Sequence, residues 1–261
     1  MKLAISNIAW NESEDEVVYS LLRNYGIAGL EVAPTRLITE PYQNKERAAC
    51  ILSHLHQQYG FVVPSMQSIL FGRNERLFGS LEERGALIDY LCRAVDFANA
   101  IGCGNLVFGA PRNRNYHSGD DVMVAEGFFR EIAEYALKHG SVLSMEANPT
   151  IYGTNYINTT HEAVDLVRRI NHPGFMVNFD LGTVIQNQED ILSLGEAITV
   201  VNHVHVSEPY LAPVIPRSIH KQAMDLLREN GYTGYVSIEM KRDENDAIGN
   251  VERVIDYVMN L

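Results

Sequence analysis

Four residues that could bind a metal ion stand at or near the ends of apolar segments in the second half of the chain. They are Glu146 in SVLSMEANP, Asp180 in FMVNFDLGT, His205 in VNHVHVSEP and Glu239 in YVSIEMK. Their spacing of roughly 25 to 34 residues is what one strand-plus-helix unit of a β/α barrel requires. Taken singly, each could instead cap a helix or pair with a neighbouring Lys or Arg. Four such residues at successive segment ends favour one shared site.

Three carboxylates gathered in one place would lose hydration and repel one another, so such a site needs a cation. Three carboxylates and one imidazole offer hard oxygen ligands and one borderline nitrogen, a set suited to Mn²⁺, Mg²⁺ or Co²⁺, with Zn²⁺ as an alternative. The three cysteines, Cys50, Cys92 and Cys103, lack CxxC spacing, which argues against a thiolate zinc site or a disulfide framework. We therefore expect the four residues to hold one divalent metal ion.

The elements that would position these residues are short apolar runs that alternate with longer amphipathic stretches. This alternation is typical of βα units on a parallel sheet. Helical periodicity is clear over 13–24 and 81–100, and Gly26, Gly60, Gly102, Gly140 and Gly231 follow helical stretches where a left-handed residue would end a helix. Eight pairs predict one closed (β/α)8 TIM barrel over residues 1–261, with its chemistry at the carboxyl ends of the strands. The expected strands are 3–9, 29–33, 61–66, 105–109, 142–147, 175–179, 201–206 and 235–240.

Composition restricts the partners. A net charge of −12 and a pI near 5.2 disfavour nucleic acid, although a local basic patch could still bind one phosphate group. No apolar run reaches the ~18 residues of a membrane span, and the N-terminus lacks a secretory apolar core. We expect a cytoplasmic protein with neither nucleic-acid nor membrane partners.

The order Glu, Asp, His, Glu on the last four expected strands resembles the xylose-isomerase-like barrels that include ketose 3-epimerases. The resemblance covers nearly the whole chain and is strongest in MEANPTIYGTNYI, NFDLGT, HVHVSEP and GYTGYVSIEM. It implies that Glu146, Asp180, His205 and Glu239 bind one ion, usually manganese, that chelates an open-chain sugar and stabilises an enediolate. It also implies that Glu146 and Glu239 remove and return the proton, in addition to binding the metal.

Two positions depart from the epimerase pattern and put the substrate in doubt more than the metal. Those enzymes have a His where this chain has Thr183, and an Arg where it has Leu211. Other polar residues near strand ends could supply substrate contacts in their place, although Trp10 and His203 could equally belong to the core, Glu31 could pair with Arg36, and Arg217 could lie on the surface. The candidate substrate-binding residues are Trp10, Glu31, Gln67, Asn148, His203, Arg217 and Lys241. The segment 111–119, with Arg112 and Arg114, is expected to be a lid or a solvated loop.

The leading functional hypothesis is a metal-dependent isomerase or epimerase of a small sugar or sugar phosphate. A sugar or inositol dehydratase or lyase could use the same scaffold and the same enediolate. A phosphodiester-cleaving endonuclease is disfavoured, because related endonucleases need more metal ligands and a basic DNA-binding surface. A non-catalytic barrel remains a further alternative, and relatives with this fold often form homodimers or homotetramers.

Overall fold

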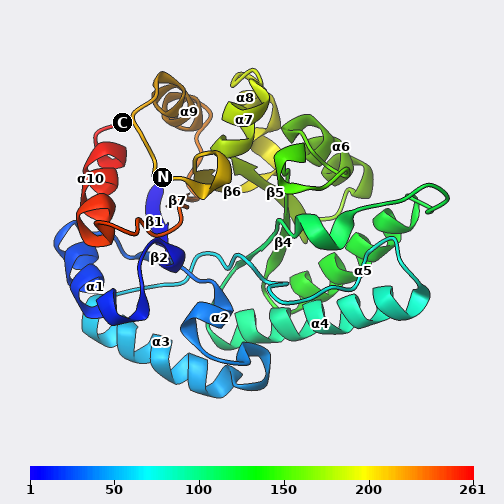
Figure 1. Ribbon diagram of the computed structural model, residues 1–261, viewed down its shortest axis with the longest axis horizontal. Helices are drawn as coiled ribbons and strands as arrows, with labels where there is room; N and C mark the ends of the chain where they lie inside the picture. The colour runs from blue at the N-terminus through cyan, green and yellow to red at the C-terminus, as the bar shows by residue number, and fades with distance from the viewer.

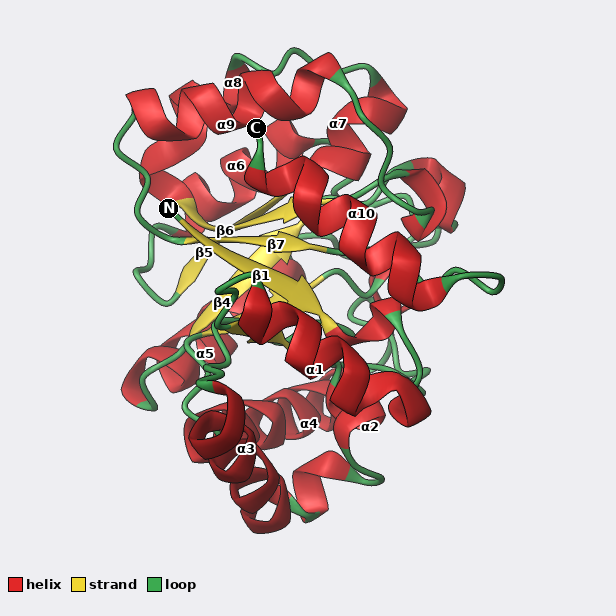
Figure 2. Ribbon diagram, turned by 90° about the vertical axis from the view of Figure 1, so that its left-hand side faces the viewer, coloured by secondary structure: helices red, strands yellow, loops and turns green.

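A seven-stranded parallel sheet, curled into most of a barrel, forms the centre of the protein, and helices cover its outer face (Figures 1 and 2). The computed structural model describes residues 1–261. Hydrogen-bonded neighbours follow the order β2-β1-β7-β6-β5-β4-β3. The strands are β1 (Lys2–Ser6), β2 (Gly29–Glu31), β3 (Asn105–Phe108), β4 (Val142–Glu146), β5 (Phe175–Asp180), β6 (Val201–Val206) and β7 (Tyr235–Ile238). The predicted TIM-barrel fold is confirmed, and most of the expected strands end one to three residues earlier or later than predicted.

The segment 61–66, expected to be the third strand, is not a continuous strand in the structure. It makes isolated parallel bridges through Val62 to β2 and through Met66 to Val32 and β3. The Val62 N–H donates to the Ala28 carbonyl, and the Met66 N–H donates to the Asn105 carbonyl, both at 2.9 Å. Pro64 between them has no N–H to donate, so a full ladder cannot form. The segment nevertheless joins the two edges of the sheet and completes the ring.

Ten α-helices lie between the strands or after them, and several begin or end where the sequence predicts. The helix expected over 81–100 is found at Leu81–Ala100, where Ser80 and Glu83 form a capping box. The five glycines expected to end helices all have positive φ values, from 69° to 80°. The helices are α1 (Asp15–Asn24), α2 (Pro34–Leu37), α3 (Lys45–Tyr59), α4 (Leu81–Ala100), α5 (Val124–Lys138), α6 (Thr160–Ile170), α7 (Leu181–Asn187), α8 (Ser193–Ala197), α9 (Ser218–Glu229) and α10 (Ala247–Met259).

One hydrophobic core of 66 buried residues joins the sheet to the helices. The last helix, α10, packs beside α1, so the end of the chain closes against its beginning (Figure 1). None of the helices combines the length and the apolar character that crossing a membrane requires. The short 3-10 turns Pro111–Arg114, Thr150–Tyr152 and Pro209–Leu211 follow β3, β4 and β6, at the carboxyl ends of the strands.

Candidate metal and active site

The structure brings together the four residues predicted to bind a metal. Nδ1 of His205 lies 2.9 Å from Oε1 of Glu146 and 3.1 Å from Oε2 of Glu239. One ligand atom from each of these three residues and from Asp180 can be chosen so that all four lie within 4.8 Å of one another. His205 is fully buried, and Glu146 and Glu239 are 9% and 7% exposed.

Strand register explains this convergence. Glu146 of β4 pairs with Asn178 of β5, and Asp180 of β5 pairs with His205 of β6. Glu239 directly follows β7, and its N–H donates to the Val206 carbonyl at 3.0 Å. Four neighbouring segments therefore present their ligating side chains at nearly the same level of the barrel.

Asp180 is held by the start of the following helix. It is the N-cap of α7, and its Oδ2 accepts the Thr183 N–H at 2.6 Å, while its Oδ1 accepts the Ser207 hydroxyl. Thr183 also places its hydroxyl 2.8 Å from the Ala147 carbonyl and is 1% exposed. Thr183 therefore positions the carboxylate of Asp180 through its N–H and ties the start of α7 to the end of β4 through its hydroxyl.

The charges in this cluster are not balanced without a cation. Burial, followed by the nearby Glu146 carboxylate, raises the pKa of Asp180 to about 6. Burial raises the pKa of Glu239 to about 7, although the neighbouring His205 opposes the shift. Carboxylates that resist ionisation because they are buried beside one another gain stability from a bound divalent ion. The oxygen-rich donor set with one imidazole nitrogen fits such an ion.

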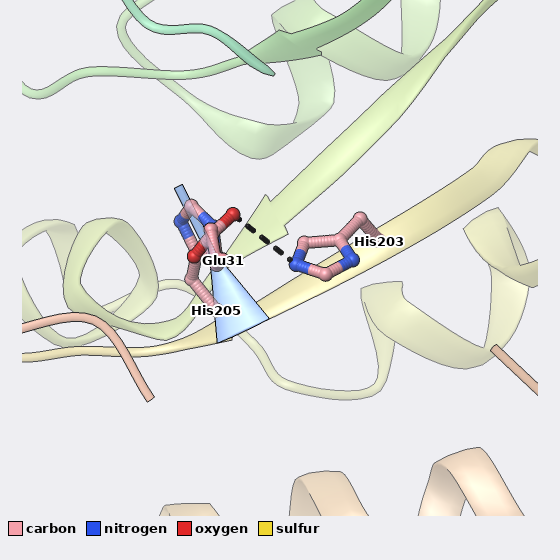
Figure 3. Close-up of side chains that lie close together, drawn as sticks. All are labelled: Glu31, His203 and His205. Carbon is pink, nitrogen blue, oxygen red and sulfur yellow. Dashed lines mark hydrogen bonds and ion pairs between the residues drawn. The ribbon is translucent and has the colours of Figure 1, made fainter. Parts of the chain in front are cut away.

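A second buried cluster lies on the other side of His205 (Figure 3). Oε1 of Glu31, at the end of β2, lies 3.0 Å from Nε2 of His205 and 3.4 Å from Nε2 of His203. The Ser237 hydroxyl donates to the other oxygen of Glu31 at 2.7 Å. Burial lowers the pKa of His205, but the carboxylates of Glu31 and Glu239 outweigh burial and hold that pKa well above its ordinary value. With Nε2 directed at Glu31, Nδ1 of His205 faces the carboxylates of the candidate metal site.

A cavity of about 520 Å³ adjoins the candidate metal site. Its lining includes the three carboxylates of the cluster, and Glu208 adds a fourth acid. Another part of the wall is apolar and comes from Ile69, Leu70 and Phe71. Arg112 is its one Lys or Arg side chain.

The candidate substrate-binding residues occupy three different environments. Gln67 and Asn148 line the cavity. Glu31 and His203 are buried behind His205 and do not line it. The remaining three also lie away from the cavity lining: Trp10 is buried and donates to Asp15 at 2.7 Å, Arg217 forms a double hydrogen bond with Glu208, and the Lys241 side chain is exposed.

Sequence reasoning missed several residues that shape the site. The Asn178 amide donates to Glu146 at 2.7 Å, and its position two residues before Asp180 on the same strand could have indicated this. Arg114, placed by the sequence in a lid or solvated loop, is fully buried and donates to the carbonyls of Glu146 at 2.8 Å and Ile157 at 3.1 Å. Arg114 thus anchors the 3-10 turn after β3 to the end of β4, and no sequence pattern predicts this contact.

Comparisons with known proteins agree with this architecture. The family model described as xylose isomerase-like TIM barrel matches residues 19–260. No curated protein sequence matches the chain. Similar solved structures include a D-allulose 3-epimerase from Methylomonas sp. in complex with D-allulose, with 15% identity and a TM-score of 0.80, covering 100% of this chain and 96% of that one.

Two further structures have the same fold. A 3-keto-D-glucoside 4-epimerase from E. coli has 16% identity and a TM-score of 0.78, with 100% of both chains covered. The IOLI protein, solved with a zinc atom, has 17% identity and a TM-score of 0.73, covering 100% of this chain and 99% of that one. The family match extends over nearly the whole chain, and the chain belongs to the xylose isomerase-like TIM barrel family.

Proposed function

We propose that the protein is a divalent-metal-dependent isomerase or epimerase of a small sugar, acting through an enediolate intermediate. The observation that carries the proposal is that Glu146, Asp180, His205 and Glu239 each offer a ligand atom within 4.8 Å of the others, and that the three carboxylates line the cavity. Structural neighbours named as sugar epimerases, one of them in complex with its sugar, support the reaction class. Manganese is the ion that we propose first, and the zinc atom in a neighbouring structure keeps Zn²⁺ as an alternative.

Glu146 and Glu239 are the residues proposed to move the proton. Both carboxylates line the cavity and approach His205 Nδ1 from separate strands, so that a sugar bound over the site could meet one carboxylate on each side. Glu146 and Glu239 are 9% and 7% exposed, so little water competes for a proton that either carboxylate would exchange with a bound sugar. A divalent ion held by the four residues supplies Lewis-acid stabilisation of the negative charge that develops on the substrate.

Two amide contacts orient the carboxylate of Glu146. The amides of Asn178 and Asn148 donate to Oε1 and Oε2 of Glu146 at 2.7 and 3.2 Å. Each oxygen of Glu146 therefore has a fixed donor, and the carboxylate is held in one orientation before substrate arrives. Side chains held in this way give the precise geometry that proton transfer at carbon needs.

The charge of the cavity favours an uncharged sugar. Glu146, Asp180 and Glu239 line it, against the single lining cation Arg112. Glu208 also lines it, but its charge is paired with Arg217 outside the lining. A bound metal ion compensates part of this negative charge but leaves little positive potential for a phosphate dianion. A sugar phosphate would have to rely on Arg112, which is exposed at the edge of the cavity.

The proposal is tested by incubating Mn²⁺-loaded protein with D-allulose, D-fructose and L-ribulose in deuterated water. An isomerase or epimerase incorporates deuterium at one carbon of the product and loses no water, whereas a dehydratase or lyase gives a product lighter by one water. We expect the exchange to vanish in Glu146→Gln and Glu239→Gln. It should persist in Glu229→Gln, which makes the same change on an exposed helix end. Exchange that survives in Glu146→Gln would contradict the assignment of the proton-transfer groups.

A further inference from the structure

Tyr152 lines the cavity but is not one of the candidate metal ligands. It ends the 3-10 turn Thr150–Tyr152 after β4 and lines the cavity beside the metal ligands. Its hydroxyl oxygen accepts the backbone N–H of Tyr210 at 2.8 Å. Tyr210 belongs to the turn Pro209–Leu211 after β6, so this bond joins two loops across the mouth of the barrel.

The bond with Tyr210 occupies an acceptor position of the phenol and leaves its hydrogen free. A tyrosine hydroxyl donates one hydrogen and accepts through its lone pairs. No acceptor for the Tyr152 hydrogen lies within bonding distance in the protein. Burial above all raises the pKa of Tyr152 to about 12, and the carboxylates of Asp180 and Glu146 add to the effect, so the hydroxyl stays protonated at neutral pH.

Most other uncharged donors in the cavity wall already have protein partners. The hydroxyls of Ser68 and Ser207 donate to Gln67 and Asp180. The Asn148 amide gives its two hydrogens to Glu146 and Ala147. The Tyr152 hydroxyl is therefore an uncharged donor of the cavity wall that has no protein acceptor. Sugar hydroxyl and carbonyl oxygens are acceptors that match it.

The backbone that fixes the phenol is strained. Tyr210 has φ 63° and ψ 19°, and Leu211 has φ 52°, both in the left-handed region. Non-glycine residues rarely adopt this conformation and keep it only where surrounding contacts hold it. Here the Leu211 carbonyl accepts the Lys241 N–H at 2.8 Å while the Tyr210 N–H reaches the phenol. The strained turn thus places the Tyr210 N–H where it orients the Tyr152 hydroxyl.

We propose that Tyr152 is a specificity-determining residue that contacts substrate by donating its hydroxyl hydrogen to one oxygen of the bound sugar. This inference rests on the proposed sugar isomerase or epimerase function and assigns a substrate contact to a residue outside the metal site. Tyr152 belongs to the loop after β4, which ends at Glu146, so its hydroxyl would donate to a sugar oxygen on the Glu146 side of the cavity.

The test compares Tyr152→Phe with Tyr156→Phe in the Mn²⁺-loaded protein. Tyr156 is a largely buried tyrosine four residues away that packs on Phe78 and does not line the cavity. Steady-state turnover of D-allulose is measured for both variants and the wild type, together with Mn²⁺ affinity and thermal unfolding. Tyr152→Phe is expected to lose about 10-fold in kcat/KM, the value of one neutral hydrogen bond, with Mn²⁺ affinity unchanged. Tyr156→Phe is expected to match the wild type in turnover.

A series of monodeoxy analogues of the same sugar separates a direct contact from a loosened loop. In the wild type, removing the sugar hydroxyl that Tyr152 contacts should lower kcat/KM by about 10-fold. In Tyr152→Phe, removing that same hydroxyl should cause no further loss, while the other analogues should behave as they do with the wild type. Turnover in Tyr152→Phe equal to that in Tyr156→Phe, or a loss that is the same for every analogue, overturns the contact while leaving the proposed function intact. A wild type that neither binds nor converts any sugar of the panel overturns both.

Discussion

Gly109→Ala is the sharpest test of the metal site, because it disturbs a ligand without removing one. A Cβ at Gly109, just after β3, would lie 2.7 Å from Oε2 of Glu146 and 3.8 Å from Oδ1 of Asn148. Ordinary contact needs about 3.4 Å, so the Glu146 carboxylate must move by roughly 0.7 Å. Metal ligands tolerate deviations of only about 0.2 Å, and we expect Mn²⁺ affinity to fall by about 10- to 100-fold.

Isothermal titration with Mn²⁺ measures this effect, and Gly127→Ala is the matched control. Gly127 lies within α5, where an added Cβ meets nothing within 4 Å. The control should bind Mn²⁺ as the wild type does and gain up to about 1 kcal/mol in unfolding free energy, since alanine favours a helix. Gly109→Ala with wild-type Mn²⁺ affinity would show that Glu146 does not hold the ion.

Three further outcomes are expected. Mn²⁺ at about 100 times its Kd should raise the Tm by about 5 to 10 °C in scanning calorimetry, and Asp180→Asn should abolish most of this shift; an unchanged wild-type Tm would contradict a metal site. Burial lowers the pKa of His220 from 6.5 to about 4, so the stability contributed by its neutral form is present above pH 6.5 and is lost as the pH falls to about 4. The loss of unfolding free energy between pH 6.5 and pH 4 amounts to about 3 kcal/mol. In urea titrations, the unfolding free energy of His220→Gln should depend less on pH over that range. Arg114→Met removes the guanidinium donor from the buried Glu146 carbonyl and leaves the Ile157 carbonyl with the Asn148 N–H alone. It should lower the unfolding free energy by about 2 kcal/mol in the same assay, whereas wild-type stability would show that Arg114 is dispensable.

Sequence periodicity was enough to predict the barrel, because βα repetition leaves a strong local signal. The apolar runs, the amphipathic stretch 81–100 and the positive-φ glycines after helices depend on neighbours close in sequence. The same argument placed Glu146, Asp180 and His205 at strand ends, and the parallel register then brought them together. The segment 61–66 was predicted less well, since apolar content alone does not show that Pro64 interrupts the ladder.

Which polar residues face the cavity was decided only by tertiary structure. Strand parity directs His203 inward, and Glu31 stands at a strand end, but neither signal distinguishes the cavity from the packed interior, where both lie behind His205. Arg114 and Tyr152 depend on loops, whose paths are set by contacts between residues far apart in sequence. The residue types therefore determined what chemistry the chain can support, while the closure of the barrel determined which side chains line the cavity.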